Sequence, residues 1–257
     1  MIKLIKFIIK KTFSFFNLEV INKKFHPNKW IPVEINKKQI NIINTCKKFS
    51  MTTELRMSIL INLIKLINKN KVQGDFVECG VWRGGNLILF QKLIEYFSIK
   101  NKIIYGYDTF HGMTAPSEFD IYYNKKTAKY LMGKENKNEN LVHTVHAICS
   151  LNQVKKNIMS VSKNNCIKLI EGDVKKTLKI KKNLPKKISI LRLDTDFYES
   201  TKIELEILFP RIQSGGVLII DDYGEWQGAR KAVDEYFGNS MPFLHIVDQS
   251  CRYLIKE

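Results

Sequence analysis

The sequence predicts an α/β fold in which a doubly wound, mainly parallel seven-stranded sheet is flanked by helices. Short, almost wholly apolar runs alternate with longer segments in which apolar residues recur at every third or fourth position. This is the pattern of buried parallel strands alternating with helices. Glycine and acidic residues directly follow several of the apolar runs, where such sheets bind their ligands. The 257 residues, 44% of them hydrophobic, suffice for one such domain and not for two large ones.

Residues 1–50 are predicted to form a basic, partly helical N-terminal extension. They contain 11 Lys against two Glu, and so carry +9 of the net charge of +17. Residues 1–16 superficially resemble a signal peptide, but four Lys interrupt the apolar run and no small-residue cleavage site follows. As a helix this segment would be amphipathic, and two interpretations stay open. It is either an interfacial helix that makes peripheral contact with an anionic membrane, or a helix that docks on its own domain or a partner subunit.

The regular pattern begins near residue 51 and defines a predicted domain at 51–257. Thr52 or Thr53 is expected to cap its first helix, and Gly74 ends that region. The predicted strands lie at 75–81, 102–108, 166–173, 187–194, 216–222, 243–248 and 252–257, and the predicted helices at 54–69, 85–96, 150–162, 198–212 and 227–237.

Residues 109–147 form a predicted lid insertion in this domain. The segment is rich in Lys and Asn and is long for a plain connection between a strand and a helix. We therefore expect it to cover part of the functional site.

The charge and the cysteines bear on the partner and the compartment. The Lys excess accompanies many Asn and Ile residues, while Arg, which leads specific base and phosphate recognition, is scarce. We therefore expect no nucleic-acid partner, although a basic nucleic-acid-binding protein stays as a minor alternative. The five Cys form no CxxC pair, which favours free thiols in a reducing cytoplasm. Uncharged apolar runs are far shorter than 18 residues, so no membrane-spanning helix is expected.

A glycine-containing loop, ECGVWRGG (78–85), follows the first predicted strand. Gly80, Gly84 and Gly85 allow the backbone to approach a ligand closely, and the helix that follows offers free N–H groups. With the acid Glu78 on the strand, this loop is similar to the S-adenosylmethionine loop of class I methyltransferases. The alternative is a turn whose glycines are needed only for packing.

Acidic residues also end the second and third predicted strands. The carboxylate of Asp108 is suited to accept hydrogen bonds from two ribose hydroxyls, with Thr109 beside it, and Phe110 is placed to cover an adenine face. Asp173 is placed to reach the adenine amino group, but it could equally cap the following helical turn.

Four carboxylates, from Asp194, Asp196, Asp221 and Asp222, follow the fourth and fifth predicted strands. Adjacent parallel strands would bring these groups within a few ångströms, where their like charges repel and shift their pKa values. A hard divalent cation such as Mg²⁺ would resolve this repulsion. Such an ion could bind two vicinal hydroxyls of a substrate and lower the pKa of one of them.

These motifs together resemble the macrocin O-methyltransferase family, which has a Rossmann-like fold. The resemblance covers residues 52–257. It rests on GDFVECGVWRGG (74–85), IYGYDTFHGM (104–113), EGDVKKTL (171–178), LRLDTDFYEST (191–201) and GGVLIIDDYGEWQGARKAVDEYF (215–237). It implies a metal-dependent enzyme that transfers a methyl group from S-adenosylmethionine to a sugar hydroxyl.

The resemblance also implies roles for individual residues. It implies Asp194, Asp221 and Asp222 as metal ligands, and Glu78, Gly80, Asp108 and Asp173 at the cofactor. Asp194 and Asp196 are the predicted catalytic residues, and a residue of the lid insertion stays as the alternative base. Related catechol-type enzymes place a Lys three residues after the first metal ligand, but this position is Phe197 here, so no Lys base is carried over. The candidate acceptor-binding residues are His143, His146, Tyr223 and Trp226, each of which could instead be a surface or packing residue.

The acceptor and the assembly are the least determined by the sequence. Because the insertion is polar, we expect a glycan or a nucleotide-linked sugar with vicinal hydroxyls rather than an apolar macrolide. O-methylation of a catechol or another small diol is the alternative. Enzymes of this type are often homodimers or larger, and we expect the same here. The expected location is the cytoplasm, with possible peripheral contact at the inner face of the membrane.

Overall fold

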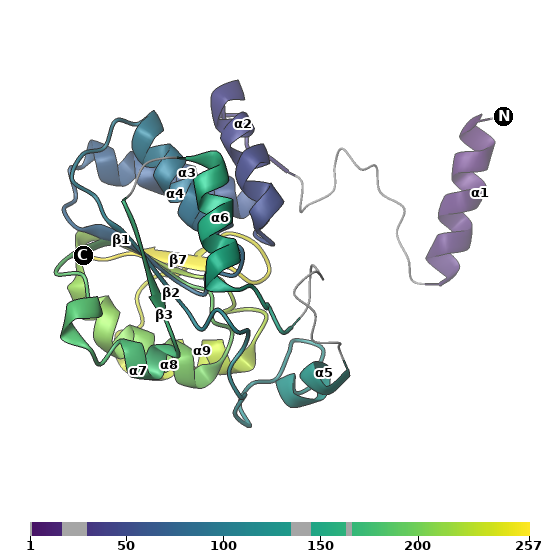
Figure 1. Ribbon diagram of the computed structural model, residues 1–257. Coiled ribbons are helices and arrows are strands. Elements are labelled where there is room, and N and C mark those ends of the chain that lie inside the picture. Colours follow the sequence, from purple (N-terminus) through teal and green to yellow (C-terminus); the bar gives the residue numbers. More distant parts are fainter. Residues whose placement is uncertain (1, 17–29, 135–144, 163–165) are drawn as a thin grey trace.

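The computed structural model describes residues 2–16, 30–134, 145–162 and 166–257 (Figure 1). The strands are β1 (Asp75–Cys79), β2 (Ile104–Asp108), β3 (Ile167–Glu171), β4 (Ile188–Leu193), β5 (Ile212–Ile220), β6 (His245–Ile246) and β7 (Arg252–Ile255). They form one sheet in the order β3-β2-β1-β4-β5-β7-β6. The first five strands are parallel, and β7 runs antiparallel to both of its neighbours. The predicted Rossmann-like, mainly parallel seven-stranded sheet is confirmed.

Helices cover both faces of this sheet (Figure 1). The helices are α1 (Ile2–Phe15), α2 (Lys37–Cys46), α3 (Glu54–Lys69), α4 (Gly85–Tyr96), α5 (Ala128–Lys134), α6 (Leu151–Val161), α7 (Val174–Thr177), α8 (Tyr198–Leu208) and α9 (Gln227–Phe237). Short 3₁₀ turns lie at Lys47–Phe49, Lys181–Asn183, Phe209–Arg211 and Gly238–Ser240. Helices α2, α3, α4 and α6 lie on one face, and α7, α8 and α9 lie on the other.

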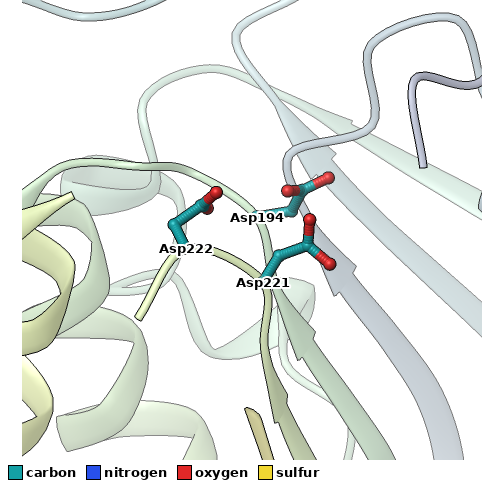
Figure 2. Close-up of side chains that lie close together, drawn as sticks. All are labelled: Asp194, Asp221 and Asp222. Carbon is teal, nitrogen blue, oxygen red and sulfur yellow. The ribbon is translucent and has the colours of Figure 1, made fainter. Parts of the chain in front are cut away.

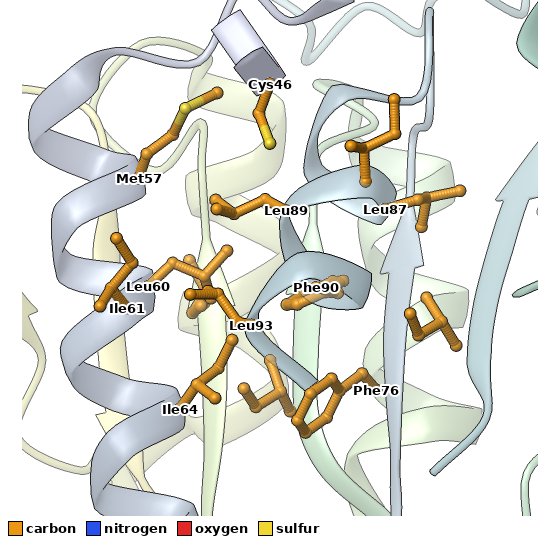
Figure 3. Close-up of a cluster of buried hydrophobic side chains, with 14 of the residues drawn as sticks. Cys46, Met57, Leu60, Ile61, Ile64, Phe76, Leu87, Leu89, Phe90 and Leu93 are labelled. Carbon is orange, nitrogen blue, oxygen red and sulfur yellow. The ribbon is translucent and has the colours of Figure 1, made fainter. Parts of the chain in front are cut away.

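The larger core cluster fills the space between the sheet and helices α3 and α4 (Figure 3). On α3, Met57, Ile61 and Ile64 are fully buried and follow the spacing of one helical face. They meet α4, where Leu89 and Leu93 are fully buried as well. This packing fixes α4, and with it the loop that precedes α4, against the sheet.

The two largest differences from the predicted element boundaries lie next to each other, at the end of α8 and the start of β5. The predicted helix 198–212 ends at Leu208, because Pro210 has no N–H to continue it, and a 3₁₀ turn follows. Strand β5 therefore begins at Ile212, before Gly215 and Gly216, which lie at an irregularity in the pairing with β4.

Two parts of the predicted N-terminal extension, helix α1 and the segment from Ile35 to Cys46, differ in how they contact the domain. Ile35, Ile43 and Cys46 are buried in the core cluster, so the core of the domain extends beyond the predicted boundary at residue 50. Helix α1 lies apart from the sheet and its helices (Figure 1), and its described side chains are exposed. The structure thus does not dock α1 on its own domain. None of the described helices is long and apolar enough to cross a membrane.

Candidate active site

A cavity opens at the C-terminal ends of β1, β2 and β4, where parallel sheets bind their ligands. It holds about 740 Å³ of empty space, part of it open to solvent. Its wall includes six predicted site residues: Gly80, Asp108, Thr109, Asp173, Asp194 and Asp196. Met51, Trp82, Met113, Thr114 and Ser200 also line it, and the sequence reasoning had not placed them there.

Asp108 fastens the loop after β1 to the end of β2. Its Oδ2 accepts the backbone N–H groups of Val81 and Trp82, at 2.7 and 2.9 Å, and its Oδ1 accepts that of Phe110 at 2.7 Å. A carboxylate offers about four acceptor positions. The Thr109 hydroxyl also donates to Oδ1, at 3.5 Å. Donors of the chain itself thus occupy about four positions, and the two ribose hydroxyls predicted for Asp108 would have to share its oxygens with them.

The three glycines of the loop after β1 have different structural roles. A Cβ atom at Gly80 would lie 1.9 Å from the carbonyl oxygen of Asp194, so only glycine lets β1 and β4 approach each other at the cavity wall. Gly84 and Gly85 do not line the cavity. A side chain at Gly84 would press on Val154 of α6, and one at Gly85 would collide with Ser50. For these two glycines the packing alternative explains the residue.

Three carboxylates meet beside the cavity (Figure 2). Asp194 follows β4, and Asp221 and Asp222 follow β5. One oxygen from each of the three lies within 4.8 Å of the other two. Asp221 and Asp222 are 5% and 7% exposed, so water does little to screen their repulsion.

Two arginines neutralise part of this charge. Arg192 on β4 is 2% exposed. Its Nη1 lies 2.8 Å from Glu78 Oε1 and 2.6 Å from Asp194 Oδ2, and its Nη2 lies 2.7 Å from Asp221 Oδ1. Arg56 on α3 pairs with Asp221 from the other side and also with Asp248. Although burial alone would raise it, these two guanidinium groups lower the pKa of Asp221 to about 2.

Asp222 and Asp196 have no such partner. Among the described residues, no Lys or Arg forms a salt bridge with either. Burial and the neighbouring carboxylates Asp196 and Asp194 raise the pKa of Asp222 well above its usual value. Burial likewise raises the pKa of Asp196 to about 7. Asp196 also has a left-handed backbone, with φ of 62°. The cluster thus holds more carboxyl groups than the two arginines balance, and the raised pKa values favour the protonated forms of Asp196 and Asp222 in the absence of a cation.

The Macrocin-O-methyltransferase (TylF) family model matches residues 18–255 of this chain. The chain belongs to the macrocin O-methyltransferase family.

Individual relatives agree with this assignment. Demethyldecarbamoylnovobiocin O-methyltransferase from Streptomyces niveus is 31% identical over 171 residues, which are 65% of this chain and 59% of that protein. The 8-demethyl-8-(2,3-dimethoxy-alpha-L-rhamnosyl)-tetracenomycin-C 4'-O-methyltransferase from Streptomyces olivaceus is 29% identical over 185 residues, 71% of this chain and 65% of that protein. The matches span less than two thirds of either relative. The solved structure of the O-methyltransferase NovP superposes with a TM-score of 0.69 at 25% identity, covering 81% of this chain and 82% of that one.

Besides Gly84 and Gly85, two further residues that we expected at the cofactor in this macrocin O-methyltransferase family member lie outside the cavity wall. Glu78 is 1% exposed and points to Arg192, and burial raises its pKa to about 7. The ring of Phe110 is 1% exposed and belongs to the main core cluster, and the backbone there has a left-handed φ of 55°. The adenine contact predicted for Phe110 is therefore not supported. Asp173 caps α7 through the Lys175 N–H and lines the cavity as well.

The four acceptor candidates do not line the cavity as a group. His143 lies outside the described residues. His146 is 3% exposed and its Nε2 lies 3.0 Å from the Met132 carbonyl oxygen, so it holds the insertion together. Tyr223 donates its hydroxyl to Asp234. Trp226 packs in a small cluster that anchors the insertion to the start of α8 and α9. For the last three, the packing interpretation fits the structure.

Proposed function

We propose that this protein transfers a methyl group from S-adenosylmethionine to a sugar hydroxyl, and that Asp194, Asp221 and Asp222 hold a divalent cation. The observation that carries the proposal is the meeting of three carboxylate oxygens within 4.8 Å beside the cavity. Asp194 belongs to both features, since it also lines the cavity. A methyl donor in the cavity and an acceptor hydroxyl at the cation would therefore be neighbours.

The residues present fit both groups. The cavity is lined by apolar side chains together with a few polar groups, as small-molecule sites are. Thr109 and Asp173 offer polar partners along its wall. The donors of the cluster are all carboxylate oxygens, which suit Mg²⁺ or a similar hard ion. Asp222 has no cationic partner among the described residues and has a raised pKa, and a bound divalent cation would favour its ionised form.

The residues of the chain divide the chemistry as follows. S-adenosylmethionine supplies an electrophilic methyl group on a sulfonium, and a divalent cation lowers the pKa of a hydroxyl bound to it. Asp196 lines the cavity two residues after Asp194 and would take the hydroxyl proton. Gly80 and Asp108 fix the wall against which the donor rests. Most of the rate would come from this positioning.

The finer identity of the acceptor is also a proposal. The name of one relative includes a rhamnosyl group and a 4'-O-methylation. The polar, Lys- and Asn-rich insertion of this chain favours a glycan or a nucleotide-linked sugar. Turnover of sugar nucleotides or oligosaccharides supports this acceptor class. Turnover of hydrophobic glycosides or simple catechols in their place contradicts it.

Calorimetric titration of S-adenosylmethionine and of Mg²⁺ tests the two-site arrangement. We expect the wild type to bind both, and Asp222→Asn to bind the methyl donor with unchanged affinity while losing Mg²⁺. Asp234→Asn, which removes an equal charge from a half-exposed side chain on α9, should keep both. A wild type that binds no S-adenosylmethionine contradicts the activity, and unchanged Mg²⁺ binding in Asp222→Asn contradicts the metal site.

A further inference from the structure

Helix α1 carries an apolar surface that nothing in the described structure covers. Leu4 is 63% exposed and Phe15 is 85% exposed, and all described side chains from residue 4 to 16 are exposed. No hydrogen bond or ion pair of the described structure joins α1 to the rest of the chain; its one side-chain bond, from Thr12 to Ile8, is internal. Burial of exposed apolar area is favourable. The helix therefore has a surface suited to a partner outside its own domain.

The apolar and basic residues of α1 lie on opposite sides. At 3.6 residues per turn, Ile5, Ile9 and Phe16 fall on nearly one line. Lys10 and Lys11 fall on the other side of the helix, and Lys6 lies between the two sides. Phe7 is an exception, since it falls on the side of the Lys residues. The apolar half comprises Leu4, Ile5, Ile8, Ile9, Phe13, Phe15 and Phe16. Such a helix can lie in a surface with one half in an apolar medium and the other in water.

The positive charge of α1 indicates that the surface it binds is negatively charged. The first 18 residues contain four Lys and no acid. A helix with Lys on its polar face and Phe and Leu on the other matches an interfacial helix at an anionic bilayer. Each Lys near such a surface strengthens binding about five-fold. We propose that α1 binds this protein to the surface of an anionic lipid bilayer.

The alternatives fit the helix less well. Fourteen residues at 1.5 Å each span about 21 Å, less than the hydrocarbon core of about 30 Å, so α1 lies along the surface and does not cross it. Pairing with α1 of a second copy would bring two Lys-rich segments together without an acid between them. A nucleic acid would meet the Lys residues but leave the apolar half in water.

Flotation of the full chain with vesicles tests this proposal. Vesicles of phosphatidylcholine alone are compared with vesicles that also contain phosphatidylglycerol. We expect flotation with the anionic vesicles only, and loss of it in Ile5→Ser/Ile9→Ser. Lys6→Gln/Lys10→Gln should weaken binding about 25-fold. The matched control, Lys181→Gln/Lys182→Gln, removes the same charge from an exposed turn of the domain and should bind like the wild type.

Thermal unfolding and S-adenosylmethionine titration of each variant confirm that the domain is folded, and neither depends on vesicle binding. A wild type that does not float overturns the proposal, as does equal binding by Ile5→Ser/Ile9→Ser. Analytical ultracentrifugation adds a further outcome. If the wild type does not bind vesicles but forms a dimer, and Ile5→Ser/Ile9→Ser dissociates this dimer, the apolar face binds a second copy of the chain instead. The proposal does not rest on the methyl-transfer activity, and either can fail alone.

Discussion

Asp108 and Asp222 stand at equivalent places, each at the C-terminal end of a parallel strand beside the same cavity, and have opposite surroundings. Asp108 accepts three backbone N–H groups and holds the loop after β1. Asp222 has no cationic partner among the described residues and faces other carboxylates. Two acids at the ends of parallel strands thus have different roles because the groups around them differ. An acid surrounded by backbone N–H donors holds a loop in place, and an acid without such donors is available to bind a ligand.

The largest effect is expected from removing Arg192, the cationic side chain that pairs with Asp194 and Asp221 and not with Asp222. Arg192→Ala leaves Glu78, Asp194 and Asp221 without their shared partner, and should lower the free energy of unfolding by about 3–5 kcal/mol. Urea denaturation measures this. Arg230→Ala, which breaks an exposed pair with Asp234, should cost less than about 1 kcal/mol. Equal losses in both variants would contradict a structural role for Arg192.

Asp108→Ala tests the other side of the comparison. Three backbone N–H groups lose their acceptor, and we expect a loss of about 3 kcal/mol in the free energy of unfolding. Asp108→Asn keeps one side-chain oxygen and should lose about half as much. Denaturation in urea again gives the values. If Asp108→Ala unfolds like the wild type while its S-adenosylmethionine affinity collapses, Asp108 serves the ligand and not the loop.

Glu204 sharpens the comparison, because it is a fully buried acid with uncharged hydrogen-bond donors only. Burial raises its pKa to about 8, although hydrogen bonds from Thr195 and Cys79 oppose the shift. The unfolded chain ionises Glu204 from about pH 4.5, so stability falls as the pH rises from there to about 8. Glu204→Gln should flatten this fall by up to about 1.4 kcal/mol for each pH unit. Denaturation at pH 6 and pH 7 measures it.

The matched control for that experiment is Glu206→Gln on the exposed side of the same helix. Its stability should depend on pH as the wild type does. A Glu204→Gln variant with the wild-type pH dependence would show that Glu204 is ionised in the folded protein.

The smallest effect, and the opposite sign, is expected for Asp222→Asn. Burial and the neighbouring carboxylates raise the pKa of Asp222, so above about pH 4 the unfolded chain ionises a group that the folded protein disfavours in its ionised form. The variant lacks this cost, so without metal at pH 7 it should be more stable by about 1 kcal/mol. Mg²⁺ should raise the melting temperature of the wild type and not of the variant, because only a ligand that binds the folded state stabilises it. A variant less stable than the wild type in the presence of a chelator would contradict this.

The sheet and the acids at its edge could be predicted from sequence, since apolar runs mark the strands and parallel strands end at one edge. Arg192 had a signal that was missed: it is the lone cation inside an apolar strand, and in the pairing of β1 with β4 it stands opposite Glu78. Arg56 gave no such signal, because it lies on α3 and is separated from Asp221 by 165 residues in the sequence. The burial of Phe110 in the core could not be predicted, since its left-handed backbone leaves no mark in the sequence.

The left-handed φ of 62° at Asp196 affects how mutagenesis at this residue must be interpreted. Asp and Asn occupy that region far more readily than residues with an aliphatic Cβ, and glycine does so freely. Asp196→Ala therefore changes the local backbone preference together with the carboxylate. Asp196→Asn changes only the chemistry, and Asp196→Gly relaxes the turn. If Asp196→Ala loses more activity than Asp196→Asn, the additional loss is due to the changed backbone conformation at this turn. The loss that both variants share is due to the missing carboxylate.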